Sequence, residues 1–296
     1  MKPFSYDLAV AYRIYPKVST GRFPPPVFSD DKLKLAEFCL QSYKNSLGQL
    51  HVKMWVILNA CPPEYEAMVK RVWGEEHLVV LHYPGVGPGT TVREQLRILT
   101  EQTDAEIVHF GEDDYFYLPD QMPLAVEFFR QTPEADFIAP YEGGELFKSD
   151  LNKMQFKQKH FCGKVWHSCI AATHTFMARR SSLLESQSMI HRLYVARKGG
   201  TIPDLGMWMA LTKKRIFNPF KFLQWTLTHR WFWAGSIFLS WYYCWRQILF
   251  GRRYTLWLPQ TCIANHMGVG LEAGGIDWQK EFQRQLASHP LGGKKN

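Results

Sequence analysis

Residues 107–114 read IVHFGEDD, a short apolar run that leads directly into three consecutive acidic residues. The run from Ile107 to Phe110 is typical of a buried strand in a parallel sheet. Glu112, Asp113 and Asp114 then fall at the carboxyl end of that strand. Because open α/β sheets bind ligands at the carboxyl ends of their strands, this stretch predicts both a fold and a ligand site.

The sequence before this stretch alternates short apolar runs with helical patterns, which is typical of βαβ units. Apolar runs predict further strands over residues 8–14, 52–58 and 78–83. Helical periodicity fills the intervals, with Ser29 or Asp30 capping the first helix and Thr90 or Thr91 capping the third. We therefore expect an α/β fold with a mostly parallel central sheet and helices on both faces.

The second half of the chain has a less regular pattern. It predicts strands over residues 137–140, 173–177 and 255–258, the last of them closing the sheet, and a short helix over residues 204–212. No linker interrupts the sequence, so we expect one domain over residues 1–270 that includes an aromatic and basic insertion at 216–252. Residues 271–296 are expected to form a C-terminal helix and a flexible tail.

Composition restricts the possible partners. Thirty-five Lys and Arg against 27 Asp and Glu give a formal net charge of +8, which favours nucleotide phosphates, acidic lipids or nucleic acid. No helix-turn-helix, zinc-finger or RNP-type motif is present, so we do not expect nucleic acid.

The cysteines and the N-terminus indicate a reducing compartment. Six cysteines occur without a CxxC pair, which favours free thiols. His160, Cys162, His167 and Cys169 match none of the usual zinc-ligand spacings. The N-terminal residues lack the apolar segment of a cleaved signal. We expect a cytoplasmic protein, peripheral on the inner face of the membrane.

Three adjacent carboxylates at a strand end repel one another unless positive charge neutralises them. Mg2+ or Mn2+ would do so, since hard cations select oxygen ligands and leave positions open for substrate phosphates. The alternative is a solvated acidic turn without a ligand.

From Leu8 to about Gly270, the chain resembles a GT-A glycosyltransferase of the family 2 type. Glu112, Asp113 and Asp114 stand in the place of that family's DxD motif. The strand end Ala11, Tyr12 and Arg13 resembles the segment that meets base and ribose. Further matches are Asn59, where many members have a base-reading Asp, and the glycine-rich loop at 84–89 followed by Arg93, which lacks the usual Asn.

The resemblance implies a metal-dependent, inverting hexosyltransferase that uses a UDP- or GDP-sugar. The residues just named would bind the donor, and Glu112 would contact the ribose or, through a water molecule, the metal. Asp114 and the late His266 would hold Mn2+ or Mg2+. Asp204 matches the position of the catalytic base, although an Asp before a helix is also a common N-cap. A lone His266 could equally serve as a structural hydrogen-bonding residue.

The implied acceptor is a hydroxyl group, on a lipid-linked or cell-surface glycan intermediate. Two alternative functions remain open at this point. A nucleotidyltransferase would share nucleotide and metal binding but needs a basic loop near the first strand, and residues 16–21 (PKVSTG) are a poor version of one. A non-catalytic protein that binds a membrane surface would use only the basic charge and the aromatic side chains.

Residues 231–245 form an uncharged aromatic stretch between Arg230 and Arg246. It is shorter than the ~20 residues that span a bilayer. Trp and Tyr with flanking Arg fit a helix that lies in the membrane interface. A buried aromatic helix, packed on the sheet or in a dimer interface, fits the same pattern.

Overall fold

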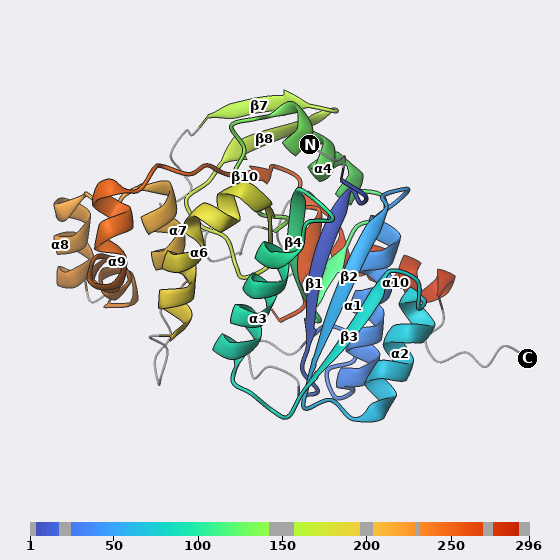
Figure 1. Cartoon of the computed structure of the whole chain (residues 1–296). Coiled ribbons are helices and arrows are strands. Elements are labelled where there is room, and N and C mark those ends of the chain that lie inside the picture. The colour runs from blue at the N-terminus through green and yellow to red at the C-terminus, as the bar shows by residue number, and fades with distance from the viewer. Residues whose placement is uncertain are drawn as a thin grey trace, which may run out of the picture.

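The computed structural model of the chain describes residues 4–17, 25–141, 157–195, 204–228, 231–268 and 275–289. Within these ranges, a nine-stranded sheet has the order β3-β2-β1-β4-β9-β6-β10-β8-β7 (Figure 1). Its strands are β1 (Leu8–Ile14), β2 (Val52–Asn59), β3 (Leu78–Tyr83), β4 (Ile107–Glu112), β6 (Phe137–Ile138), β7 (Gln158–Phe161), β8 (Lys164–Ser168), β9 (Phe176–Arg179) and β10 (Leu256–Pro259). A separate two-stranded sheet pairs β5 (Tyr115–Tyr117) with β11 (Ala264–His266).

The strands from β3 to β4 pair in parallel, as the βαβ pattern predicts. Within the described sheet only β9 and β8 run against the others, because both pair antiparallel with their neighbours. The prediction of an α/β fold with a mostly parallel central sheet is therefore confirmed.

The alternation of side chains along β1 explains why helices cover both faces. Its large residues, Leu8, Val10, Tyr12 and Ile14, belong to one buried cluster, whereas the small Ala9 and Ala11 belong to the other. Successive residues of a strand point to opposite faces, so this one strand contributes to two cores.

One layer of helices packs on each face of the sheet (Figure 1). The cluster that contains Leu8 is covered by α1 (Lys32–Ser46), α2 (Pro63–Trp73), α4 (Met122–Gln131) and α10 (Trp278–Ser288). The cluster that contains Ala11 is covered by α3 (Pro88–Glu101), α6 (Arg180–Val195) and α7 (Asp204–Thr212). Two more helices, α8 (Pro219–Leu227) and α9 (Trp231–Phe250), lie at the end of the molecule beyond α7.

Several local predictions were wrong in detail. The N-cap of α1 is Asp31, which accepts a hydrogen bond from the Lys34 amide. Helix α3 begins earlier than predicted, at Pro88 after Gly87, because a proline at the first position suits a helix start without a side-chain cap. Strand β9 begins only at Phe176, and β10 lies between β6 and β8 instead of closing the sheet.

The His-rich segment around Cys162 forms a hairpin that the sequence pattern did not predict. Strands β7 and β8 pair antiparallel across Cys162 and Gly163, both with positive φ angles, which is typical of a tight hairpin turn. In the described structure, none of the six cysteines is part of a disulfide. No helix in the described part of the chain combines the length and apolarity needed to cross a bilayer.

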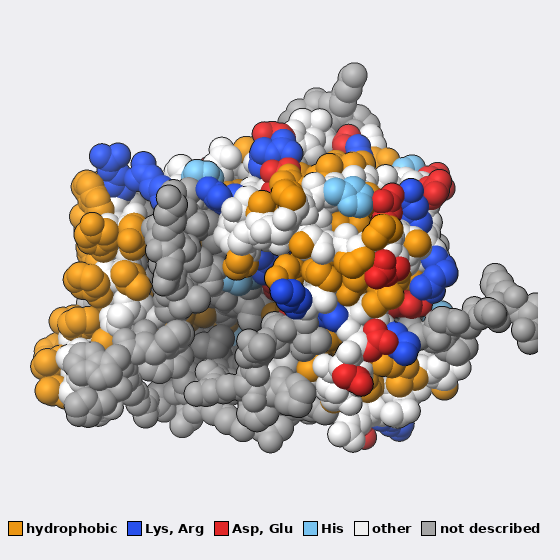
Figure 2. Space-filling view, turned by 90° about the horizontal axis from the view of Figure 1, so that it is seen from below, with side chains coloured by type: hydrophobic (Ala, Val, Ile, Leu, Met, Phe, Trp, Pro, Cys, Tyr) orange, Lys and Arg blue, Asp and Glu red, His pale blue; other side chains and the backbone are white. Residues whose placement is uncertain are grey.

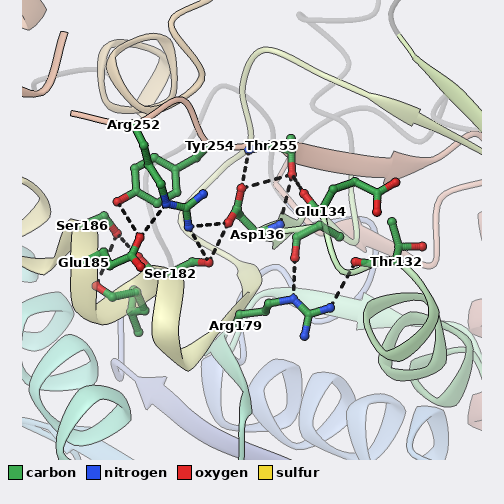
Figure 3. Close-up of polar contacts among 12 residues, drawn as sticks. Thr132, Glu134, Asp136, Arg179, Ser182, Glu185, Ser186, Arg252, Tyr254 and Thr255 are labelled. Carbon is green, nitrogen blue, oxygen red and sulfur yellow. Dashed lines mark hydrogen bonds and ion pairs between the residues drawn. The ribbon is translucent and has the colours of Figure 1, made fainter. Parts of the chain in front are cut away.

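A polar network ties the second half of the sheet to α6 and to the residues after α9 (Figure 3). Buried Asp136 accepts hydrogen bonds from the Ser182 hydroxyl at 2.7 Å, the Arg252 guanidinium at 2.7 Å and the Thr255 amide at 2.8 Å. Arg252 also pairs with Glu185 at 2.6 Å. One carboxylate thus joins three segments that are remote in sequence.

Candidate functional site

A cleft of about 400 Å3 lies at the carboxyl ends of β1, β2 and β4. The loop Gly85 to Gly87 and the first turn of α3 line it, together with Tyr15, Lys17 and Lys32. The acidic residues 112–114 line the same cleft. Its size suits a small-molecule ligand, and its position is the one that the sequence pattern predicted.

Glu112 is hydrogen-bonded by side chains from β1 and from the residue before β9. Arg13, at the end of β1, donates its Nε to Glu112 Oε1 at 3.0 Å and forms an ion pair with the same oxygen. The Thr175 hydroxyl donates to Oε2 at 2.8 Å. Both oxygens of Glu112 are therefore engaged, and its charge is matched by Arg13.

Asp113 has its own cation. The Lys32 ammonium, at the first position of α1, lies 3.0 Å from Asp113 Oδ2, and both side chains are about nine-tenths buried. The Tyr15 amide donates to the same oxygen at 3.0 Å. Burial would lower the pKa of Lys32, but Asp113 and Asp114 outweigh it and raise that pKa above its ordinary value. Lys32 is therefore a permanent positive charge inside the site.

Asp114 faces His266 on β11. The distance between Asp114 Oδ2 and His266 Nε2 is 3.4 Å, and the Gly268 amide donates to Nδ1 on the other side of the ring. Burial would raise the pKa of Asp114, but attraction to His266 outweighs it and holds that pKa well below its usual range. The second oxygen, Oδ1, is buried and has no hydrogen-bond partner in the described structure.

Each of the three carboxylates thus faces one base from a different element, Arg13, Lys32 or His266. Basic side chains of the protein therefore neutralise the three carboxylates. The argument from the sequence that their repulsion requires a metal ion was wrong. The described residues contain no group of three or more His, Cys, Asp or Glu arranged to hold a metal. The buried Oδ1 of Asp114 still fits a hard cation, because that oxygen would otherwise stay unsatisfied.

Asn59 holds the glycine-rich loop in place. Its Nδ2 donates to the Val86 carbonyl at 2.7 Å, and its Oδ1 accepts from the Val86 amide at 2.8 Å. Gly85, with a φ of +94°, allows the loop to turn there. The amide of Asn59 is thus used on the backbone of the loop, and it shapes the cleft that it lines.

Three residues expected to bind the donor lie away from the cleft surface. Ala11 and Tyr12 are fully buried in the two cores, so their side chains cannot reach a ligand in the cleft. Tyr12 packs against Gly111, where an added Cβ would lie 2.5 Å from the ring. Arg93 folds back on its own helix, donating to Gly89 O at 3.3 Å and to Thr90 Oγ1 at 3.0 Å.

Asp204 is the first residue of α7, as the sequence predicted. Its side chain lies outside the described residues, and so does the basic loop candidate beyond Lys17. Leu205 to Leu211 are buried in the core that contains Ala11.

Reasoning from the sequence missed Lys32, Tyr15 and Thr175. Lys32 gave no signal because a lysine in the first turn of a helix normally lies in solvent. Tyr15 lines the cleft and is 44% exposed, so its ring is accessible to a ligand. Its place directly after the β1 strand could have indicated this position.

Searches of protein-family models and of curated proteins found no match to this chain. Among solved structures, a mannosyltransferase from Pyrobaculum calidifontis, in complex with GDP-Man and Mn2+, is 14% identical (TM-score 0.40); 64% of this chain aligns with 50% of that one. S. aureus TarS 1–349 in complex with UDP is 14% identical (TM-score 0.43; 69% and 54% covered). A cytidylyltransferase from Leptospira borgpetersenii is 14% identical (TM-score 0.35; 65% and 67%). The chain spans about half the length of the first two.

Proposed function

We propose that this chain is a GT-A type glycosyltransferase that moves a sugar from a nucleoside diphosphate donor to a hydroxyl acceptor. The observation that carries the proposal is the buried, unpartnered Oδ1 of Asp114 in a cleft at the carboxyl ends of parallel strands. Such an oxygen, next to the fixed positive charges of Arg13 and Lys32, suits a ligand that combines phosphate groups with a divalent cation.

The donor's diphosphate would meet positive charge from several sources. Lys17 and Lys32 line the cleft, and the first turn of α3 opens onto it at Pro88. A helix N-terminus attracts anions through the positive end of its dipole. These fixed charges would stabilise the negative charge that develops on the leaving diphosphate. The exposed ring of Tyr15 offers a surface on which a base could stack.

We assign the metal ion, Mn2+ or Mg2+, to Asp114 and His266. Bound there, it would supply Lewis-acid stabilisation of the leaving diphosphate. Glu112 and Asp113 would act through Arg13 and Lys32, orienting these cations instead of binding the metal. Asn59 would position the loop rather than read the base.

For an inverting transfer, we infer that Asp204 takes the proton of the acceptor hydroxyl as that oxygen attacks the anomeric carbon. We further infer that residues 1–270 act as one catalytic domain. A lipid-linked or cell-surface glycan intermediate is our proposal for the acceptor, which would bring the enzyme to the inner face of a membrane.

Calorimetric titration of UDP and GDP into the purified chain, with and without Mn2+, tests the proposal. We expect one nucleotide to bind more tightly with Mn2+ than without. The variant Asp114→Asn should lose this dependence on the metal, whereas Glu76→Gln, at an exposed residue outside the cleft, should keep it. Failure of both nucleotides to bind under either condition would overturn the proposal.

The products separate this function from nucleotide transfer. A glycosyltransferase given the matching nucleotide sugar releases the nucleoside diphosphate, whereas a nucleotidyltransferase given a nucleoside triphosphate releases pyrophosphate. We expect the first product and not the second. Nucleotide binding without either product would leave a binding protein as the remaining function.

A further inference from the structure

The helices α8 and α9 carry most of the exposed apolar surface of the described chain. Ten of its thirteen exposed large hydrophobic side chains lie between Phe217 and Phe250. Figure 2 shows apolar side chains gathered at this end of the molecule, with Lys and Arg beside them. A contiguous patch of this kind marks a contact with a partner or a membrane, unlike isolated surface hydrophobics.

Helix α9 has two apolar faces with different roles. Ala234, Ile237, Cys244 and Ile248 are buried in the core that α7 also contributes to. The exposed face presents Phe238, Tyr242, Trp245 and Leu249, at spacings of four, three and four residues, which follow one side of a helix. The buried face accounts for the packing of α9 on the rest of the protein. The exposed face makes no contact with that core and is accessible to another partner.

Helix α8 extends the same surface. Phe220, Leu223 and Leu227 are exposed at spacings of three and four residues, while Trp225 is buried. An apolar groove of about 410 Å3 runs between the two helices, lined by residues such as Phe217, Phe222, Ile237, Phe238 and Trp241. We call the exposed apolar residues of α8 and α9, with Phe217 and this groove, the aromatic face.

The segment of the chain that carries the aromatic face is basic. Between Leu205 and Leu271 the sequence contains eight Lys and Arg and no Asp or Glu. Arg246 follows Trp245 on α9 and lies 5.3 Å from its ring centroid, and Arg253 is exposed just after the helix. An aromatic ring beside an Arg suits the headgroup level of a bilayer, where the ring is buried and the charge reaches phosphate.

A second copy of the chain fits this surface poorly. Pairing two aromatic faces would bring together two basic segments that contain no acidic residue. An anionic lipid surface satisfies both properties at once, since acyl chains receive the apolar side chains and phosphates meet the bases. We propose that α8 and α9 dock the protein in the interface of an anionic membrane through the aromatic face, without spanning it.

Sedimentation of the full chain with large unilamellar vesicles tests this proposal independently of nucleotide binding. We expect the chain to pellet with phosphatidylcholine vesicles that contain about one third phosphatidylglycerol and to pellet less with pure phosphatidylcholine. High salt should weaken the association through the basic residues but leave an apolar component.

Variants identify the surface. Phe220 and Phe250 are 83% and 78% exposed, so replacing both should spare the fold. We expect Phe220→Ser with Phe250→Ser to weaken vesicle binding by about tenfold or more. Phe4→Ser, at an exposed phenylalanine on the N-terminal segment, should bind like the unchanged chain. Arg246→Gln should weaken binding only to the anionic vesicles.

Three results would overturn the proposal. The chain could stay in the supernatant with anionic vesicles, or the double variant could pellet like the unchanged chain. Light scattering could instead show a dimer that the double variant dissociates, which would assign the aromatic face to a second copy.

Discussion

Acid sensitivity should trace to one buried histidine, His109 on β4. Its ring is fully buried, with Nδ1 2.9 Å from the Tyr43 hydroxyl and Nε2 3.4 Å from the Tyr117 hydroxyl. Burial lowers the pKa of His109 to about 3, against 6.5 for the ordinary side chain. The folded protein thus keeps this imidazole neutral at pH values where the unfolded chain protonates it.

The sign and size of the effect follow from this difference. Between pH 6.5 and pH 3 the unfolded state binds the additional proton, so acidification stabilises it relative to the folded state. One pKa unit is worth about 1.4 kcal/mol, so His109 should remove about 2.5 kcal/mol of unfolding free energy between pH 7 and about pH 4.5.

Urea denaturation followed by circular dichroism at the two pH values measures this loss. The variant His109→Gln cannot take up the proton, so its stability should fall about 2.5 kcal/mol less than that of the unchanged chain over the same interval. Any constant cost of the substitution cancels in this comparison. His191→Gln, at an exposed histidine, is the matched control and should behave like the unchanged chain. An equal loss on acidification in His109→Gln and the unchanged chain would refute the reasoning.

Four further outcomes are expected. Asp114→Ala should abolish metal-dependent nucleotide binding, and calorimetry that shows unchanged dependence on Mn2+ would remove Asp114 from the metal site. Asp204→Asn should bind donor normally but lose transfer by about a hundredfold or more, measured as release of nucleoside diphosphate; retained transfer would reduce Asp204 to a helix cap. Lys32→Met should lower the unfolding free energy, measured by urea denaturation, by about 3–5 kcal/mol, because it leaves the buried Asp113 without its cation. Adding Asp113→Asn should recover part of that loss. Asp136→Ala should lower the unfolding free energy by about 2–3 kcal/mol, because the Ser182 hydroxyl and the Thr255 amide lose their acceptor. Arg252 is half-exposed and keeps Glu185 and solvent as partners. A loss under about 0.5 kcal/mol would contradict this account of the network.

Local patterns predicted the first half of the fold because each strand there is a continuous apolar run. The hairpin of β7 and β8 escaped prediction, since Lys159, His160, Lys164 and His167 break its apolar alternation. The aromatic stretch was foreseen as a helix, but hydrophobicity alone could not say which side of it packs. The structure divides α9 into a packed side and an exposed side. The interpretation as a buried helix describes the packed side, and the membrane-interface interpretation of the exposed side stays a prediction.

The position of the acidic residues was visible in the sequence, whereas the ion pairs that they form were not. Arg13 lies 99 residues from Glu112, and Lys32 and His266 come from α1 and β11. Only the folded arrangement of β1, α1 and β11 around the end of β4 brings these charges together. Sequence reasoning therefore placed Arg13 and His266 in the site without pairing them with the carboxylates, missed Lys32, and attributed the neutralisation of the carboxylates to a metal.

These pairings limit how a metal ion can bind in the proposed site. Glu112 and Asp113 are paired with Arg13 and Lys32, whereas Asp114 Oδ1 has no hydrogen-bond partner in the described structure, so we propose Asp114 and His266 as the protein ligands. Mg2+ and Mn2+ prefer six ligands, and two side chains leave most positions to water and phosphate oxygens. If the donor's diphosphate binds next to an ion held by Asp114 and His266, metal and nucleotide would each raise the affinity of the other. The calorimetric titration with and without Mn2+ measures this coupling, because reciprocal binding requires the same gain whichever ligand is added first.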